Sequence, residues 1–133
     1  MFKYYTFTPV KTEKTTIDFR QKTEDVEVFR FDGNVVSVSG EESDIDALVE
    51  EQSAKINLTE ITQADFAELV KNSPQIENIR RQVRDEIAKK YLIADEIKLM
   101  KLPADDTDRV AYEDYVSYCR ANGDAKKQEC GYL

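Results

Sequence analysis

Carboxylates are the most frequent side chains in this sequence that could take part in catalysis or metal binding. The densest group is Asp105, Asp106 and Asp108, and the run Asp95-Glu96-Ile97-Lys98 has the order of acids and lysine found in some metal-dependent nucleases. A calcium loop also needs a glycine at its turn, and no glycine follows Asp105 before Gly123. Acidic residues at the start of a helix, which offset its exposed amide groups, are the simpler explanation. The sequence therefore predicts no metal site.

No other pattern in the sequence predicts catalysis or a bound cofactor. Histidine is absent, so the serines have no imidazole base and a histidine-containing zinc site cannot form. The four glycines are not arranged as a phosphate-binding loop. We therefore expect no catalytic residues and no cofactor, and we look for the function in surfaces that contact other molecules.

Cys119 and Cys130, the only two cysteines, lie eleven positions apart. A disulfide between them would close a short loop and stabilise the tail by about 2–3 kcal/mol. The alternative is two reduced thiols, one packed in a helix face and one free in the tail, which is typical of a chain without a secretion signal. The sequence leaves both possibilities open.

The charge of the chain is negative and unevenly distributed. The formal net charge is −8, and residues 41–73 contain nine acidic and two basic side chains, a net charge of −7. Such a balance disfavours direct binding of nucleic acid or of acidic lipid. No run approaches the roughly 20 apolar residues of a membrane span, and the start of the chain lacks a signal-peptide pattern. The acidic stretch predicts either a solvated helix face or a docking surface for a basic partner.

The first forty residues predict β-structure. Candidate strands lie at Phe2–Val10, Thr15–Phe19, Val26–Phe31 and Val35–Val38, all rich in β-branched or aromatic residues. Asp32-Gly33-Asn34 separates the last two and can supply the positive φ angles of a tight hairpin. Residues 55–59 could add a further strand to the same sheet.

From Ser43 onward the pattern predicts helices. Ser43 and Thr62 are candidate N-caps, and Ser73-Pro74 marks the start of the longest helix. That helix carries apolar residues at steps of three and four, and the last helix carries a second apolar stripe that ends at Asn122-Gly123. A short helix between them is expected to turn Ile97 and Met100 inward.

Together these elements predict an α+β fold with a small antiparallel β-sheet at the N-terminus and a helical C-terminal region. Residues 1–60 are expected to form a small β-rich domain with one short helix. Residues 61–133 are expected to be helical, with helices at about 62–72, 74–93, 95–102 and 108–122.

The second half of the chain contains an ordered set of motifs. Ile79-Arg80-Arg81 is followed by Tyr91-Leu92-Ile93-Ala94-Asp95-Glu96-Ile97-Lys98-Leu99-Met100, an acidic break, and Tyr112-x-x-Tyr115-Val116-x-x-Cys119-Arg120. Over residues 74–133 this pattern resembles the C-terminal region of tailed-bacteriophage tail proteins, which include tail-fibre assembly and accessory proteins. The resemblance implies a virion component or assembly factor that holds other proteins, and it transfers no active-site residues.

We therefore expect a non-enzymatic bacteriophage structural or tail assembly protein, located in the virion or in the host cytoplasm during assembly. Its expected partners are other tail proteins or copies of itself, bound through the two apolar stripes at Ile79, Val83, Ile87, Tyr112, Tyr115 and Val116. The alternative is an acidic protein that mimics DNA and blocks a nucleic-acid-binding host protein. Its acidic surface would consist of Glu41, Glu42, Asp44, Asp46, Glu50 and Glu51.

Overall fold

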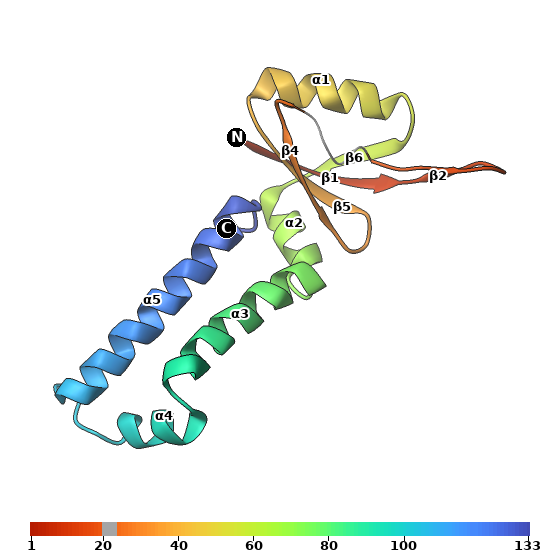
Figure 1. The fold of residues 1–133 in the computed structure, drawn as a ribbon. Helices are drawn as coiled ribbons and strands as arrows, with labels where there is room; N and C mark the ends of the chain where they lie inside the picture. Colours follow the sequence, from red (N-terminus) through yellow and green to blue (C-terminus); the bar gives the residue numbers. More distant parts are fainter. Residues whose placement is uncertain (20–23) are drawn as a thin grey trace.

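The computed structural model describes residues 1–19 and 24–133, and it confirms the α+β fold (Figure 1). Over these residues, the main sheet is antiparallel with the strand order β4-β5-β1-β6. Its strands are β4 (Glu27–Phe31), β5 (Val35–Ser39), β1 (Phe2–Thr8) and β6 (Asn57–Ile61). The candidate strand at Thr15–Phe19 does not join this sheet. Its central residues form β3 (Thr16–Ile17), which pairs with β2 (Val10–Lys11) in a separate ribbon.

The turn between β4 and β5 has the predicted geometry. Gly33 has a φ of 84° and Asn34 a φ of 58°, so the residues that tolerate positive φ occupy the positions that require it. The hairpin then pairs Phe31 with Val35. The strand expected at residues 55–59 begins two residues later and pairs with β1, on the opposite side of β1 from β5.

Both faces of the sheet are covered by helices (Figure 1). On one face, Tyr5, Phe7, Val36 and Val38 pack with Ile45 and Leu48 of α1 (Glu42–Ser53). On the other face, Tyr4, Phe31 and Val35 pack with Phe66 and Val70 of α2 (Gln63–Val70). Neighbouring residues such as Tyr4 and Tyr5 enter different clusters because successive side chains of a strand point to opposite faces.

Two of the three predicted helix caps are confirmed. The Thr62 hydroxyl accepts a hydrogen bond from the Asp65 amide at 3.1 Å, and the Ser73 hydroxyl accepts one from the Ile76 amide at 3.3 Å. The cap predicted at Ser43 is wrong, because α1 begins at Glu42 and its N-cap, Glu41, makes no side-chain capping bond. Acidic residues in the first turn of α1 still offset its exposed amides.

The remaining helices form an arm that projects from the sheet (Figure 1). α3 (Pro74–Lys90) leads away, α4 (Ile93–Met100) turns at the far end, and α5 (Thr107–Glu129) returns to the sheet. The predicted end of the last helix at Asn122-Gly123 is wrong, since α5 continues six residues beyond Gly123. The helical arm below means α3, α4 and α5 together. Among the described residues, no helix has the length and apolar character needed to cross a membrane.

Candidate protein interface at the tip of the helical arm

The two apolar stripes expected to bind a partner pack against each other inside the arm. Tyr112 and Val116 of α5 are buried, while Ile79, Val83 and Ile87 of α3 and Tyr115 of α5 are half-buried. Gly123 lies so close to α3 that an added Cβ would be 2.5 Å from Cγ2 of Val83. The structure thus places all six residues along one intramolecular contact between α3 and α5, with Ile79 toward the sheet and Tyr112 toward the far end. Tyr112 and Val116 are therefore core residues of the arm and not a partner surface.

Tyrosine rings close the far end of this α3–α5 contact. The ring of Tyr91 lies 5.0 Å from that of Tyr112, edge to face, and 5.8 Å from that of Tyr115. The Nζ atom of Lys90 lies 4.9 Å from the centre of the Tyr115 ring. Such edge-to-face and cation–π arrangements stabilise packed aromatic groups. The short helix α4 packs against this end of α5.

Specific polar contacts fix the rotation of α4 on this surface. The Tyr112 hydroxyl donates to Oε1 of Glu96 at 2.8 Å. Burial of the ring, and then the hydrogen bond and negative charge of Glu96, raise the pKa of Tyr112 above its usual value. The Arg109 guanidinium also donates to the Leu102 carbonyl at 2.6 Å, beyond the end of α4. A polar residue of α4, Glu96, is therefore turned toward α5.

This rotation leaves an apolar face of α4 in solvent. Ile93 is 75% exposed, Ile97 54% and Met100 52%, and the preceding Leu92 is 65% exposed. The prediction that Ile97 and Met100 face inward is wrong, because Glu96 and Leu99 occupy the inner side. We call Leu92, Ile93, Ile97 and Met100 the tip patch. Isolated exposed apolar residues are ordinary, but a contiguous patch of them marks an interaction site.

A groove borders the tip patch on the α3 side. Its volume is about 580 Å³, and Ile87, Ala88, Tyr91, Leu92 and Ile93 supply its apolar lining. Arg84, Asp85 and Glu96 supply polar groups at its edge. An apolar floor with a few polar groups is the usual composition of a binding site. The tip patch and the groove together form the candidate interface.

The sequence analysis missed Leu92 and Ile93 as interface residues, although the sequence contains a signal for them. Tyr91, Leu92 and Ile93 are consecutive apolar residues at a break between two helices. Three consecutive side chains cannot all face one buried stripe, so at least one had to be exposed or to begin a new surface.

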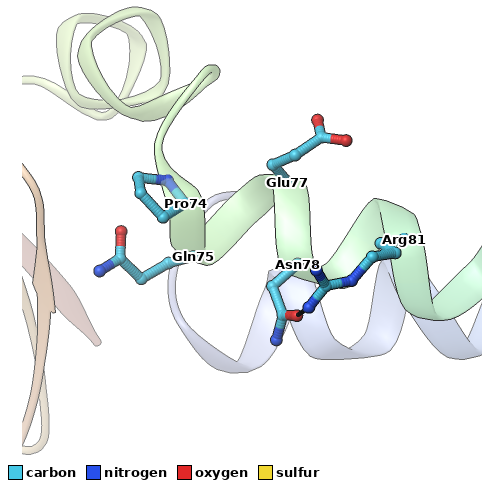
Figure 2. Close-up of a pocket in the computed structure, with 5 residues that line it drawn as sticks. All are labelled: Pro74, Gln75, Glu77, Asn78 and Arg81. Atoms are coloured by element: carbon cyan, nitrogen blue, oxygen red, sulfur yellow. Dashed lines mark hydrogen bonds between the residues drawn. The ribbon is translucent and has the colours of Figure 1, made fainter.

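A second hollow lies at the start of α3 and has a different character. Figure 2 shows its lining residues, which all come from one helix: Pro74, Gln75, Glu77, Asn78 and Arg81. The Arg81 guanidinium donates to Asn78, and Glu77 points away from both. Its volume is about 510 Å³. Since its described lining residues all belong to α3, this hollow is a feature of the exposed helix surface.

The acidic residues singled out in the sequence lie on and next to α1. Glu41, Glu42, Asp46, Glu50 and Glu51 are exposed, and Asp44 is half-buried. The Lys3 ammonium donates to Asp46 at 2.9 Å and lies 3.7 Å from Glu42, so one part of this acidic face is neutralised within the chain. The hydrogen bond to Asp46 raises the pKa of Lys3. The structure therefore gathers these carboxylates on α1 and at its N-cap, Glu41.

Neither a disulfide nor a metal cluster is present among the described residues. Cys119 and Cys130 are both free thiols, as in the reduced alternative. The expectation that one of them lies free in the tail is wrong, because Cys130 is buried in the cluster that contains Tyr4 and Phe66. Burial raises the pKa of the Cys130 thiol. Within residues 1–19 and 24–133, no three acidic or cysteine side chains converge on a point where they could share a metal ion.

Comparison with known proteins identifies no relative of this chain. No family model matches this chain, and neither curated proteins nor solved structures give a significant match.

Proposed function

We propose that this chain is a non-enzymatic assembly protein that binds other proteins through the tip of its helical arm. The partners would be other tail proteins of a bacteriophage or copies of this chain. The resemblance over residues 74–133 suggests the phage context. The interface itself is argued from the tip patch.

The observation that carries the proposal is the outward face of α4. Burying Ile93, Ile97 and Met100 within the chain would stabilise it by about 1.5–3 kcal/mol for each side chain fully removed from water. The chain instead holds Glu96 on the inner side by its hydrogen bond from Tyr112. Fixed contacts that keep apolar side chains in water are expected where a partner covers them.

Co-expression with candidate partners tests this proposal. Tail-fibre and baseplate proteins of tailed bacteriophages would be co-expressed with this chain and captured through a tag on it. The variant Ile93→Lys places a charge in the tip patch, and we expect it to weaken the captured complex by about tenfold or more. Affinity would be measured on the purified pair by titration calorimetry.

Leu69→Lys is the matched control for this experiment. Leu69 lies on α2, outside the arm, and is 55% exposed, so the variant adds the same charge at a similarly exposed apolar site. We expect its binding to equal that of the wild type. Equal binding by Ile93→Lys would refute the proposal, and so would capture of no tail protein by a chain that also stays monomeric.

A second function is favoured by the acidic face of α1. Five exposed carboxylates on or beside one helix could stand in for phosphates toward a nucleic-acid-binding host protein. Replacing Glu41, Glu42, Asp44, Asp46, Glu50 and Glu51 with their amides should then abolish inhibition of such a protein, while Ile93→Lys should have no effect. Unchanged inhibition by the six-fold variant would eliminate this function.

A further inference from the structure

We propose that the tip patch binds a helix of another protein whose apolar side chains are bordered on one side by acidic residues. This inference rests on the proposed function and names the chemistry of the partner. It is argued from neighbouring rows of side chains along α4, each with the i, i+4, i+7 spacing of one helix face.

The inner row of α4 holds the helix in place. It contains Glu96 and Leu99, which are both half-buried, and Oε1 of Glu96 accepts the hydrogen bond from Tyr112. The middle row lies one position further along the sequence and consists of Ile93, Ile97 and Met100. All of its members belong to the tip patch and are more than half exposed. The middle row is therefore an apolar ridge that the inner row keeps turned outward.

The outer row gives this ridge a basic border. It follows the middle row by one further position and consists of Ala94, Lys98 and Lys101. Both lysines are exposed, and neither forms an ion pair with a residue in the described part of the chain. Asp95, the other exposed charged residue of α4, lies on nearly the opposite side of the helix from Ile97. There it accepts a hydrogen bond from the Leu92 amide at 3.2 Å. The charges beside the ridge are thus positive.

The shape of the tip favours a helix as its occupant. A ridge of side chains on one helix packs into the groove between two rows of another helix. An extended segment would instead need the open edge of a sheet, and the backbone groups of α3 and α4 are engaged within their own helices. The groove beside Tyr91 and Leu92 continues the apolar surface onto the end of α3 and offers room for a large side chain of the partner helix.

The basic border argues against a second copy of this chain on the ridge. An antiparallel two-fold pair of α4 helices would place the outer rows of both copies along the same edge of the contact, so the lysines would repel. A parallel pair would turn each outer row toward the inner row of the other copy, where Glu96 is already bonded to Tyr112. The acidic helix α1 has opposite charge, but its buried apolar residues, Ile45 and Leu48, pack on the sheet.

Two synthetic peptides serve as probes of this chemistry. Both are helix-forming peptides of about 18 residues, or five turns, with one stripe of leucines. The row beside the leucines is glutamate in one peptide and lysine in the other. We expect the wild-type chain to bind the glutamate peptide with a Kd of roughly 10–100 µM and the lysine peptide about fivefold more weakly or less tightly still. Because the chain has a net charge of −8, a general attraction would favour the lysine peptide, so the expected preference reports the local border.

Charge reversal on the outer row tests the border directly. The double variant Lys98→Glu/Lys101→Glu should reverse the preference and bind the lysine peptide more tightly, as titration calorimetry would measure. Lys11→Glu/Lys14→Glu is the matched control. It makes the same change in net charge at exposed lysines of the β2–β3 ribbon, far from the arm (Figure 1), and should keep the wild-type preference.

Two further comparisons test the ridge and the helical form of the partner. Ile97→Gln should weaken binding of both peptides about tenfold, while Leu69→Gln, at an apolar residue of α2 that is 55% exposed, should bind them as the wild type does. A glutamate peptide with a proline at its centre cannot form a continuous helix and should bind about tenfold more weakly.

The outcomes separate this inference from the proposed function. Equal binding of the two peptides, or an unchanged preference in Lys98→Glu/Lys101→Glu, refutes the acidic border of the partner. Undiminished binding of the proline peptide refutes a helix, and no binding of either peptide up to about 1 mM refutes the inference as a whole. A wild-type dimer in sedimentation equilibrium that Ile97→Gln abolishes would show that a second copy covers the ridge. In each case, capture of a tail protein that Ile93→Lys abolishes would still support the proposed function.

Discussion

At the scale of single residues, buried and half-buried tyrosines connect distant parts of the chain. Tyr112 donates to Glu96, Tyr115 donates to the Glu86 carbonyl at 2.8 Å, and Tyr4 donates to the Gly131 carbonyl at 2.9 Å. In each case the ring packs among apolar groups and the hydroxyl reaches one specific acceptor. Burial is the main cause that raises the pKa of all three tyrosines. Their hydroxyls therefore act as donors only while they remain protonated.

We predict that the chain loses stability as the pH rises above about 10, the ordinary pKa of tyrosine. The folded-state pKa values are raised, so the unfolded chain loses these protons first and the stabilisation disappears as the pH passes through the folded values. Tyr112→Phe should cost about 1 kcal/mol at pH 8 by removing the hydrogen bond, and should reduce the alkaline loss. Urea unfolding at pH 8 and above pH 10 measures both effects.

Tyr118→Phe is the control for this prediction, because Tyr118 is 64% exposed. It should leave both the stability at pH 8 and the alkaline loss close to those of the wild type. An alkaline loss as large in Tyr112→Phe as in the wild type would show that this hydroxyl contributes nothing to it.

At the scale of elements, two glycines show how position decides the role of a residue. Gly123 was expected to end a helix, but it lies inside α5, where the absence of a Cβ lets Val83 of α3 approach. The helix ends at Glu129, and Gly131, with a φ of 83°, takes the left-handed conformation beyond it. The close contact at Gly123 sets the distance between α3 and α5.

Gly123→Ala should therefore destabilise the chain, by about 1–2 kcal/mol, because the new Cβ would overlap Val83. Within an unobstructed helix the same change is stabilising by about 0.5–1 kcal/mol. The sign of the effect thus tests the contact. In a Val83→Ala background the overlap is relieved, and Gly123→Ala should become neutral or stabilising. Denaturant unfolding of the four chains measures the coupling, and additive effects would contradict it.

At the scale of the whole molecule, the arm is tied to the sheet at both of its ends. α3 begins next to the sheet with Ile76 in the same cluster as Tyr4 and Phe66. α5 is followed by the turn of residues 130–133. The Ser37 hydroxyl donates a hydrogen bond to the Cys130 carbonyl of this turn at 2.6 Å, and the Gln63 side-chain amide donates one to the Tyr132 carbonyl at 2.8 Å. The C-terminus therefore lies against the sheet (Figure 1). These two attachments hold the tip patch at a fixed place relative to the sheet.

Deleting residues 130–133 should loosen the arm and leave the α1 side of the sheet intact. We expect a loss of about 2–4 kcal/mol from the missing hydrogen bonds and packing. Amide hydrogen exchange should speed up in the last turns of α5 and change little in α1 and β5. Ser37→Ala should show a smaller loss of about 1–2 kcal/mol, since it leaves one buried carbonyl without its donor. Deleting Leu133 alone, which is 57% exposed, is the control.

Much of the local structure could be predicted from the sequence. The Asp32-Gly33-Asn34 turn and the caps at Thr62 and Ser73 depend on residues within four positions of each other, so neighbouring residue types are sufficient to specify them. The stripe from Ile76 to Tyr91 was also readable, because its period is that of a helix with one buried face. The surface that such a stripe packs against could not be predicted, since an apolar stripe fits a partner and another helix of the same chain equally well.

The sequence by itself thus determined an α+β chain, the type and approximate place of most elements, and the absence of histidine chemistry. Only the tertiary structure decided which side of α4 is exposed. That helix has Leu99 on one side and Ile97 and Met100 on another, so its own pattern does not choose between them. The choice is made by Tyr112 and Arg109, which lie in another helix and hold α4 through contacts across the fold.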